Sequence, residues 1–207
     1  MSRETRWWWI RHAPVTSHAG RIYGQQDVPA DLTGTAAAIR GLAAALPGDA
    51  VALTSDLQRT IATAEALSAA GCRWAEHHRE PDFREQHFGE WQGLTSEAFT
   101  AVRDRLPHSG WLAPAFERPP AGESFSDVTA RVVPAIIRHT SAQAGRDIVA
   151  VGHGGSIRAA LGFALGVDPE SALSFSLETL SLTRLDHIET RDDSGVWRIV
   201  CVNRVFG

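Results

Sequence analysis

Short apolar segments alternate with longer, alanine-rich segments along this chain, and this alternation is the feature that most limits its fold. Short runs bounded by polar or glycine residues are typical of buried strands, whereas the longer runs have helical spacing. Strands that alternate with helices fold around a largely parallel sheet, so we expect a three-layer α/β/α sandwich. The expected strands cover 6–11, 50–55, about 73–77, 147–152, 177–189 and 196–203, and the expected helices cover 33–46, 55–71, 95–105, 124–143 and 154–166.

The expected helix at 55–71 carries signals at both of its ends. Ser55 and Gln58 have the spacing of a capping box, and Gly71 is a typical helix stop. At the start of the chain, Trp7 and Trp9 would point to one face of a strand and Trp8 to the other. Packing under helices on both faces of the sheet explains all three tryptophans, and no chemistry is assigned to them.

Composition narrows the class of protein. The formal net charge is 20 − 24 = −4, so no basic field invites nucleic acid. No apolar run approaches the roughly 20 residues that span a bilayer, and the apolar run before Arg11 is too short for a secretory signal. The two cysteines, Cys72 and Cys201, have neither zinc nor disulfide-framework spacing. We expect one cytoplasmic domain over residues 1–207, with no nucleic-acid or membrane partner.

Basic and imidazole side chains follow three of the expected strands. Arg11 and His12 follow the first, Arg59 lies just beyond the second, and His153 follows "DIVAV". Ligands of α/β sheets gather outside the carboxyl ends of the strands, so these groups would share one edge. Converging arginine and histidine side chains predict a pocket for a dianion such as a phosphoryl group.

Four motifs then identify a family. The segments "IRHAPV", "TSDLQRTIATAEAL", "REQHFGEWQG" and "VGHGGSIRAAL" resemble, in order and spacing, those of the histidine phosphatase superfamily, which has the phosphoglycerate-mutase-like fold. The resemblance extends from residue 6 to about 166 and implies a phosphoric monoester hydrolase. It also implies that His18, Tyr23 and the backbone of Gly24 lie near the bound phosphate. The loops at about 87–122 would form a lid.

Phosphoryl chemistry assigns a role to each remaining group. His12 is largely neutral at pH 7 and can attack phosphorus directly, forming a phosphohistidine. Arg11 and Arg59 would hold phosphoryl oxygens, and His153 would donate a further hydrogen bond if the phosphate kept it protonated. Gly154 opens a helix whose N-terminus favours an anion. With these donors no metal or other cofactor is expected.

Three acidic residues of one segment are candidates for the proton donor to the leaving alcohol. Glu85, Asp82 and Glu90 all lie in the same segment, and spacing does not choose among them. The family resemblance selects Glu85, because the acid of the family precedes "FG-W-G" in the same way. The chain departs from the family at Ala13 and Pro14, where glycine and glutamate are usual, and at His18, where asparagine is frequent.

Three functions remain open at this point. The first is a phosphomonoesterase, the second a mutase that returns the phosphoryl group to another hydroxyl, and the third a non-catalytic scaffold that binds phosphorylated ligands. Hydrolysis is favoured over the mutase because the segment between Trp91 and Ser124 is short for a mutase lid and the tail is short. The scaffold is disfavoured because His12, Arg59, Glu85 and His153 are all present. The pattern at 20–33 is similar to α-ribazole phosphatases, which makes α-ribazole 5′-phosphate the leading substrate candidate. A broad-specificity sugar phosphatase or bisphosphatase is the rival.

Recognition of the leaving alcohol depends on loops that the motifs do not cover. Trp91, Trp111 and Phe116 either rim the pocket as a lid or pack within their own loops. A charged substrate would need basic side chains pointing inward, for which the loops offer Arg21, Arg84, Arg103, Arg105 and Arg118. An exposed edge strand would permit a homodimer.

Overall fold

The strands assemble into one six-stranded sheet in the order β3-β2-β4-β1-β5-β6, in a computed structural model that describes residues 3–102, 111–190 and 195–207. The first four strands are mutually parallel, and β5 runs antiparallel to β1 and β6. The strands are β1 Glu4–Arg11, β2 Ala50–Thr54, β3 Trp74–Arg79, β4 Asp147–Gly152, β5 Leu182–Ile188 and β6 Val196–Arg204.

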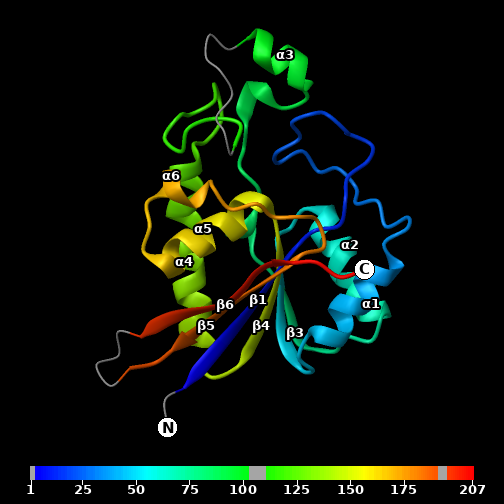
Figure 1. Ribbon diagram of the computed structural model, residues 1–207, viewed down its shortest axis with the longest axis vertical. Helices are drawn as coiled ribbons and strands as arrows, with labels where there is room; N and C mark the ends of the chain where they lie inside the picture. Colours follow the sequence, from blue (N-terminus) through cyan, green and yellow to red (C-terminus); the bar gives the residue numbers. More distant parts are fainter. Residues whose placement is uncertain (1–2, 103–110, 191–194) are drawn as a thin grey trace.

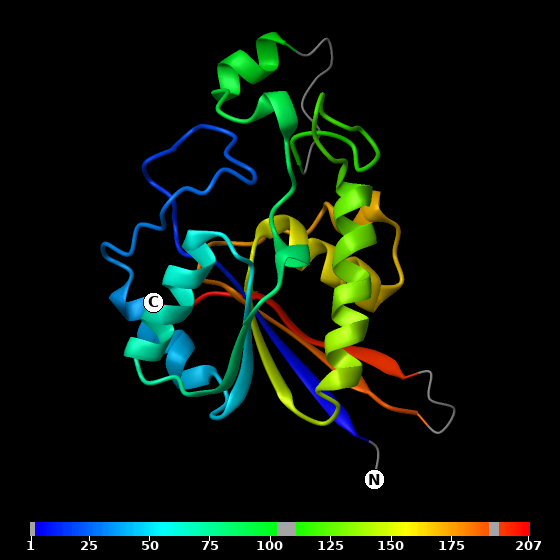
Figure 2. The same cartoon turned by 180° about the vertical axis from the view of Figure 1, so that it is seen from behind.

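Helices cover both faces of this sheet. Figures 1 and 2 show α1 and α2 on one side and α4 and α5 on the other, which confirms the three-layer sandwich. The helices are α1 Ala36–Ala45, α2 Gln58–Ala69, α3 Ser96–Ala101, α4 Phe125–Ala142, α5 Gly154–Leu165 and α6 Pro169–Ala172, with short 3₁₀ turns η1 Pro81–Phe83 and η2 Gly89–Trp91. Among the described residues, no helix is both long and apolar enough to cross a membrane.

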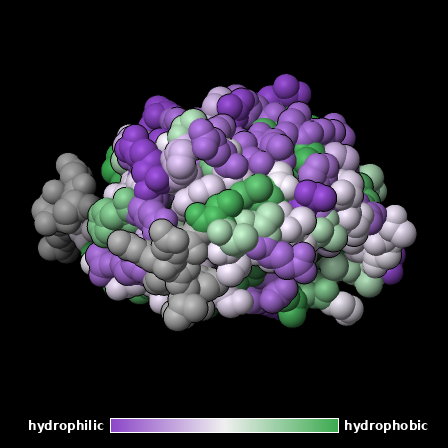
Figure 3. All heavy atoms as spheres, turned by 90° about the horizontal axis from the view of Figure 1, so that it is seen from above, coloured by the Kyte–Doolittle hydropathy of each residue, from purple (hydrophilic) through white to green (hydrophobic). Residues whose placement is uncertain are grey.

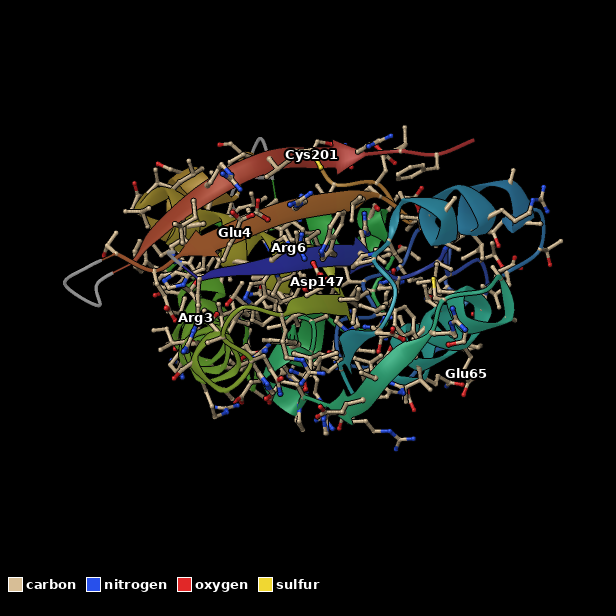
Figure 4. All side chains as sticks on the ribbon, turned by 90° about the horizontal axis from the view of Figure 1, so that it is seen from below. Arg3, Glu4, Arg6, Glu65, Asp147 and Cys201 are labelled. Atoms are coloured by element: carbon tan, nitrogen blue, oxygen red, sulfur yellow. The ribbon has the colours of Figure 1, made fainter. Side chains whose placement is uncertain are left out.

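The tryptophans of β1 divide between the faces as predicted. Trp7 and Trp9 are stacked with ring centroids 5.4 Å apart and are buried beneath α4 and α5. Phe83 packs against Trp9 at 4.8 Å, so this core lies directly under the segment that carries Glu85. Trp8 faces the α1 and α2 side, where its indole N–H donates to Asp147 at 2.9 Å. Asp147 also pairs with Arg6 at 2.5 Å near the amino end of the sheet (Figure 4).

Three expectations for the secondary structure were wrong in detail. The Ser55–Gln58 capping box does not form, because Leu57 is the N-cap of α2 and the Ser55 hydroxyl is bonded elsewhere. The strand expected at 177–189 begins only at Leu182, since Leu180 has φ +57°, which breaks an extended strand. Helix α3 covers part of the expected 95–105, and residues 103–105 lie outside the described residues.

Two long segments rise beyond the carboxyl ends of the parallel strands (Figure 1). They are residues 12–35, which follow β1, and the described residues 80–102 and 111–124, which lie between β3 and α4. The two segments contact each other, because Ile22 accepts from Gly93 at 2.6 Å and donates to Leu94 at 3.0 Å. Seen from this end, the surface is mostly hydrophilic around a smaller hydrophobic patch (Figure 3). A homodimer formed through an exposed edge strand of this sheet stays a prediction.

Candidate active site

His12, Arg59 and His153 come together where β1, β2 and β4 end. The strands β1 and β4 are neighbours, and the backbone N–H of His12 donates to Gly152 at 3.0 Å. This pairing brings the His12 and His153 rings to a centroid distance of 5.1 Å. Arg59 reaches them from the first turn of α2, which follows β2. All three side chains are buried.

The His12 ring is held with one particular nitrogen facing the site. Its Nδ1 lies 2.7 Å from the carbonyl oxygen of Ala13. Because a carbonyl only accepts hydrogen bonds, Nδ1 carries the hydrogen and Nε2 carries the lone pair. Burial lowers the pKa of His12 well below its usual value, and the charge of Arg59 lowers it further. The ring is therefore a neutral nucleophile at pH 7.

His153 is also neutral in the absence of a bound phosphate, and its role as a protonated donor to phosphate stays a prediction. Its Nδ1 accepts from Nε of Arg59 at 3.3 Å, so its Nε2 carries the hydrogen and lies 2.8 Å from the Ser55 hydroxyl. Burial lowers the pKa of His153 well below its usual value, with Arg59 and His12 contributing next. A phosphoryl dianion between these groups would raise that pKa again.

Because the pKa values of His12 and His153 are lowered, both rings should take up a proton only well below pH 6.5. We expect their ring Cε1–H signals in NMR spectra to stay at the neutral position at pH 6.5, where an unperturbed histidine is half protonated. The unfolded chain binds more protons than the folded protein below that pH, so the free energy of unfolding should fall as pH drops below 6.5. Spectra of His12→Ala and His153→Ala assign the signals. A midpoint near 6.5 for either ring would contradict the prediction.

Arg59 is anchored by the backbone of the first long segment. Its guanidinium donates to the carbonyl of Gly24 at 2.6 Å and to that of Gln26 at 2.9 Å, and it lies over the Tyr23 ring at 5.1 Å. Gly24 has φ +48°, and a Cβ there would lie 2.8 Å from the backbone carbonyl oxygen of Gln86, so glycine is required. Tyr23 and Gly24 therefore border the site, and Gly24 contributes a carbonyl that orients Arg59.

Arg11 is the second guanidinium at this edge. One of its terminal nitrogens donates to the Leu177 carbonyl at 2.5 Å, while its Nε is buried without a partner among the described residues. Burial raises the pKa of Tyr23, and the positive charge of the neighbouring Arg11 lowers it in part. The orphaned Nε is a donor that an anion at the site would satisfy.

Glu85 is the carboxylate that the structure brings to the site. Its Oε1 accepts from the backbone N–H of Gly155 at 3.0 Å and of Gln86 at 2.9 Å, leaving Oε2 for other partners. A Cβ on Gly155 would lie 2.3 Å from Oε1, so only glycine permits this approach. Of the other candidate acids, Asp82 pairs with Arg138 at 3.4 Å and Glu90 is exposed.

The N-terminus of α5 holds the Glu85 carboxylate, and phosphate binding at Gly154 stays a prediction. Sequence reasoning placed the first N–H groups of this helix against phosphate, whereas the Gly155 N–H binds Glu85. Gly154 is buried beside the same carboxylate: a Cβ there would lie 3.7 Å from Glu85 Oε2. The helix start therefore orients the candidate acid.

A half-buried ion pair that sequence reasoning missed supports the Glu85 segment. Arg131 donates to both carboxylate oxygens of Glu123, at 3.0 and 2.8 Å. The same guanidinium donates to the carbonyls of Asp82 at 2.5 Å and Glu85 at 3.0 Å. Gln25 adds a donor to the Glu85 carbonyl at 2.9 Å. No short-range pattern signals this arrangement, because its members come from three separate segments.

Among the remaining predicted residues, Trp111 approaches the site, whereas His18, Trp91 and Phe116 have other surroundings. The half-buried His18 bonds to Ser17 at 3.0 Å, and within the described ranges no hydrogen bond or ring contact joins it to His12, Arg59 or His153. Trp91 is buried against Phe99, and Phe116 is 67% exposed. Trp111 alone of the three loop aromatics approaches the site, since its indole N–H donates to Gln86 at 3.0 Å. The lid stays a prediction.

Three of the five basic loop residues proposed for a charged substrate are engaged elsewhere. Arg21 donates to the Gly93 carbonyl, Arg84 pairs with Asp56, and Arg118 pairs with Asp127. Arg103 and Arg105 lie outside the described residues. Arg158 on α5, which sequence reasoning did not single out, borders the site instead: its guanidinium lies 4.3 Å from the Trp111 ring centroid.

A separate cavity of about 470 Å³ lies at the opposite end of the sheet. It is lined by residues of α4, α5, β5 and β6, among them Phe163, His187 and Trp197, and by none of the candidate site residues. Within the described ranges, no group of three or more His, Cys, Asp or Glu side chains is placed to hold a metal ion.

The site thus combines a buried imidazole that has an available lone pair, two guanidinium groups and a carboxyl group. These are the groups that an enzyme needs to transfer a phosphoryl group by way of a phosphohistidine. The model of the histidine phosphatase superfamily, branch 1, matches residues 7–203. The chain belongs to the histidine phosphatase superfamily. The fold and family expected from the sequence are confirmed.

Similar proteins include phosphatases and a mutase. The chain is 32% identical over 167 residues to the glucosyl-3-phosphoglycerate phosphatase of Mycolicibacterium vanbaalenii, covering 76% of this chain and 73% of that protein. It is 29% identical over 181 residues to a probable phosphoglycerate mutase of Photorhabdus laumondii, covering 86% and 83%. A solved mycobacterial glucosyl-3-phosphoglycerate phosphatase superposes with a TM-score of 0.81 at 26% identity, covering 96% of this chain and 98% of that one. The prediction of a phosphoric monoester hydrolase of this family is confirmed.

Proposed function

We propose that this protein hydrolyses a small phosphorylated metabolite, without a metal, through a phosphohistidine on His12. The observation that carries the proposal is the orientation of His12. Its Nδ1–H is bound by the Ala13 carbonyl, so the Nε2 lone pair is the one available for attack beside Arg59 and His153. The free cysteines, Cys72 and Cys201, are consistent with a cytoplasmic location, which is part of the proposal.

The two chemical steps follow from this arrangement. In the first, Nε2 of His12 forms a bond to phosphorus, the phosphorus–oxygen ester bond breaks, and Glu85 gives its proton to the leaving alcohol. Arg11 and Arg59 stabilise the charge on the phosphoryl oxygens. In the second step Glu85 accepts a proton from water, the resulting hydroxyl bonds to phosphorus, and the nitrogen–phosphorus bond breaks.

The test is turnover of p-nitrophenyl phosphate in the presence of EDTA, followed by a panel of phosphorylated metabolites that includes α-ribazole 5′-phosphate, sugar phosphates and 3-phosphoglycerate. We expect chelator-resistant release of phosphate and an acid-labile, alkali-stable phosphoenzyme after quenching. Loss of turnover with EDTA, or no turnover of any phosphomonoester, would refute the proposal. Isomerisation of 3-phosphoglycerate without phosphate release would favour the mutase.

A further inference from the structure

Arg158 is a buried cation that forms no close ion pair with the residues that the structure describes. It is 7% exposed, and its Nε donates to the Phe175 carbonyl at 2.9 Å. Among the described residues, no carboxylate lies within ion-pair distance of its guanidinium. Burial lowers its pKa to about 10 although the charge of Glu85 opposes that shift, so Arg158 is charged at neutral pH. Glu85 is the nearest opposite charge, and a desolvated guanidinium without a close ion-pair partner favours binding of a further anion.

The guanidinium borders the place where the leaving group must lie. A Cβ built on Gly154 would stand 2.9 Å from Nη1 of Arg158, 3.7 Å from Oε2 of Glu85 and 3.7 Å from the Trp111 ring. Oε2 is the oxygen of Glu85 that the Gly155 and Gln86 N–H groups leave free. If Glu85 protonates the leaving oxygen, the alcohol carrying that oxygen lies next to Arg158.

The surroundings hold this guanidinium in place. The Trp111 ring covers it at 4.3 Å, and the Trp111 indole N–H donates to Gln86, the residue after Glu85. The Phe175 carbonyl fixes Nε, so the terminal nitrogens are left to meet a ligand. A planar guanidinium presented in this way matches a carboxylate or phosphate group.

From this geometry we propose that Arg158, backed by Trp111, selects substrates whose leaving alcohol carries a second anionic group close to the ester oxygen. The proposal rests on the proposed function and specifies its substrate class. It also ranks the candidates: α-ribazole, a neutral alcohol, offers Arg158 no ion-pair partner, whereas a phosphorylated hydroxy acid or a bisphosphate supplies one.

The test uses two ligands that differ only where Arg158 would act. 3-Phosphoglycerate and glycerol 3-phosphate share a primary phosphate ester, and the first has a carboxylate where the second has a hydroxymethyl group. Binding of each is measured by calorimetry in a His12→Ala background, with and without Arg158→Met. We expect 3-phosphoglycerate to bind about 10- to 100-fold more tightly when Arg158 is present, which is the range for a hydrogen bond to a charged group, and the two affinities to become equal in Arg158→Met.

The controls separate recognition from structure and from catalysis. Arg40→Met makes the same chemical change on the exposed face of α1 and should leave the affinity ratio unchanged. Arg158→Lys should restore part of the preference. Equal affinities with Arg158 present, no binding of either ligand, or a ratio unchanged by Arg158→Met would overturn the inference. Because binding is measured without turnover, a failed phosphatase assay with p-nitrophenyl phosphate would count against the proposed function alone.

Discussion

The His12→Ala variant is expected to lose at least about 10⁴-fold in kcat on every phosphomonoester that the parent hydrolyses, because the nucleophile is removed and no other group can form the nitrogen–phosphorus bond. His153 is no substitute, since its Nδ1 is bound to Arg59 and its Nε2–H faces Ser55. The loss should be the same for good and poor leaving groups. Initial rates with p-nitrophenyl phosphate and glycerol 3-phosphate measure it.

A matched control is available for this substitution. His78 is an exposed histidine of β3, paired with Glu76, and His78→Ala should leave kcat unchanged. Thermal unfolding of both variants shows whether the fold is intact. In a folded His12→Ala protein, a phosphoenzyme that still forms after quenching, or activity within tenfold of the parent, would show that His12 is not the nucleophile.

The gathering of the central residues could be predicted because it depends on topology alone. Parallel strands end at one edge, so Arg11, His12 and His153 had to meet there once β1 and β4 were neighbours. The faces of Trp7, Trp8 and Trp9 followed from the two-residue period of a strand. These inferences need only the order of elements and the alternation of side chains.

What could not be predicted depends on contacts between distant segments. Ser55 has the spacing of a helix cap, but its hydroxyl bonds to His153, 98 residues away in the sequence. Arg158 looks like an ordinary helical residue, and only the packing of α5 against Trp111 turns its guanidinium toward the site. The Arg131–Glu123 pair likewise supports Glu85 through backbone carbonyls that no motif encodes. Long-range side-chain directions of this kind require the structure.

Glu85→Gln should separate substrates by their leaving group. The amide keeps the shape and can still accept a hydrogen bond from the Gly155 N–H, but it has no acidic proton to give. For glycerol 3-phosphate, whose alkoxide cannot leave without a proton, kcat should fall about 10²- to 10⁴-fold, the usual contribution of general acid catalysis. For p-nitrophenyl phosphate the stable phenolate leaves unaided, so the first step should be far less affected. A burst of p-nitrophenol followed by slow turnover would locate the remaining loss in hydrolysis of the phosphohistidine.

The exposed Glu90 lies five residues further along the same segment and provides the control. Glu90→Gln should leave both substrates unaffected, because its carboxyl group is not held against α5 as that of Glu85 is. If Glu85→Gln lowered burst rates for both substrates equally, the carboxylate would act by orienting the site rather than by giving a proton. If Glu90→Gln produced the leaving-group dependence instead, the acid would have to reach the site through a movement of residues 86–90. The expected pattern, dependence on the leaving group in Glu85→Gln alone, follows from the one carboxylate oxygen that the Gly155 and Gln86 N–H groups leave unbound.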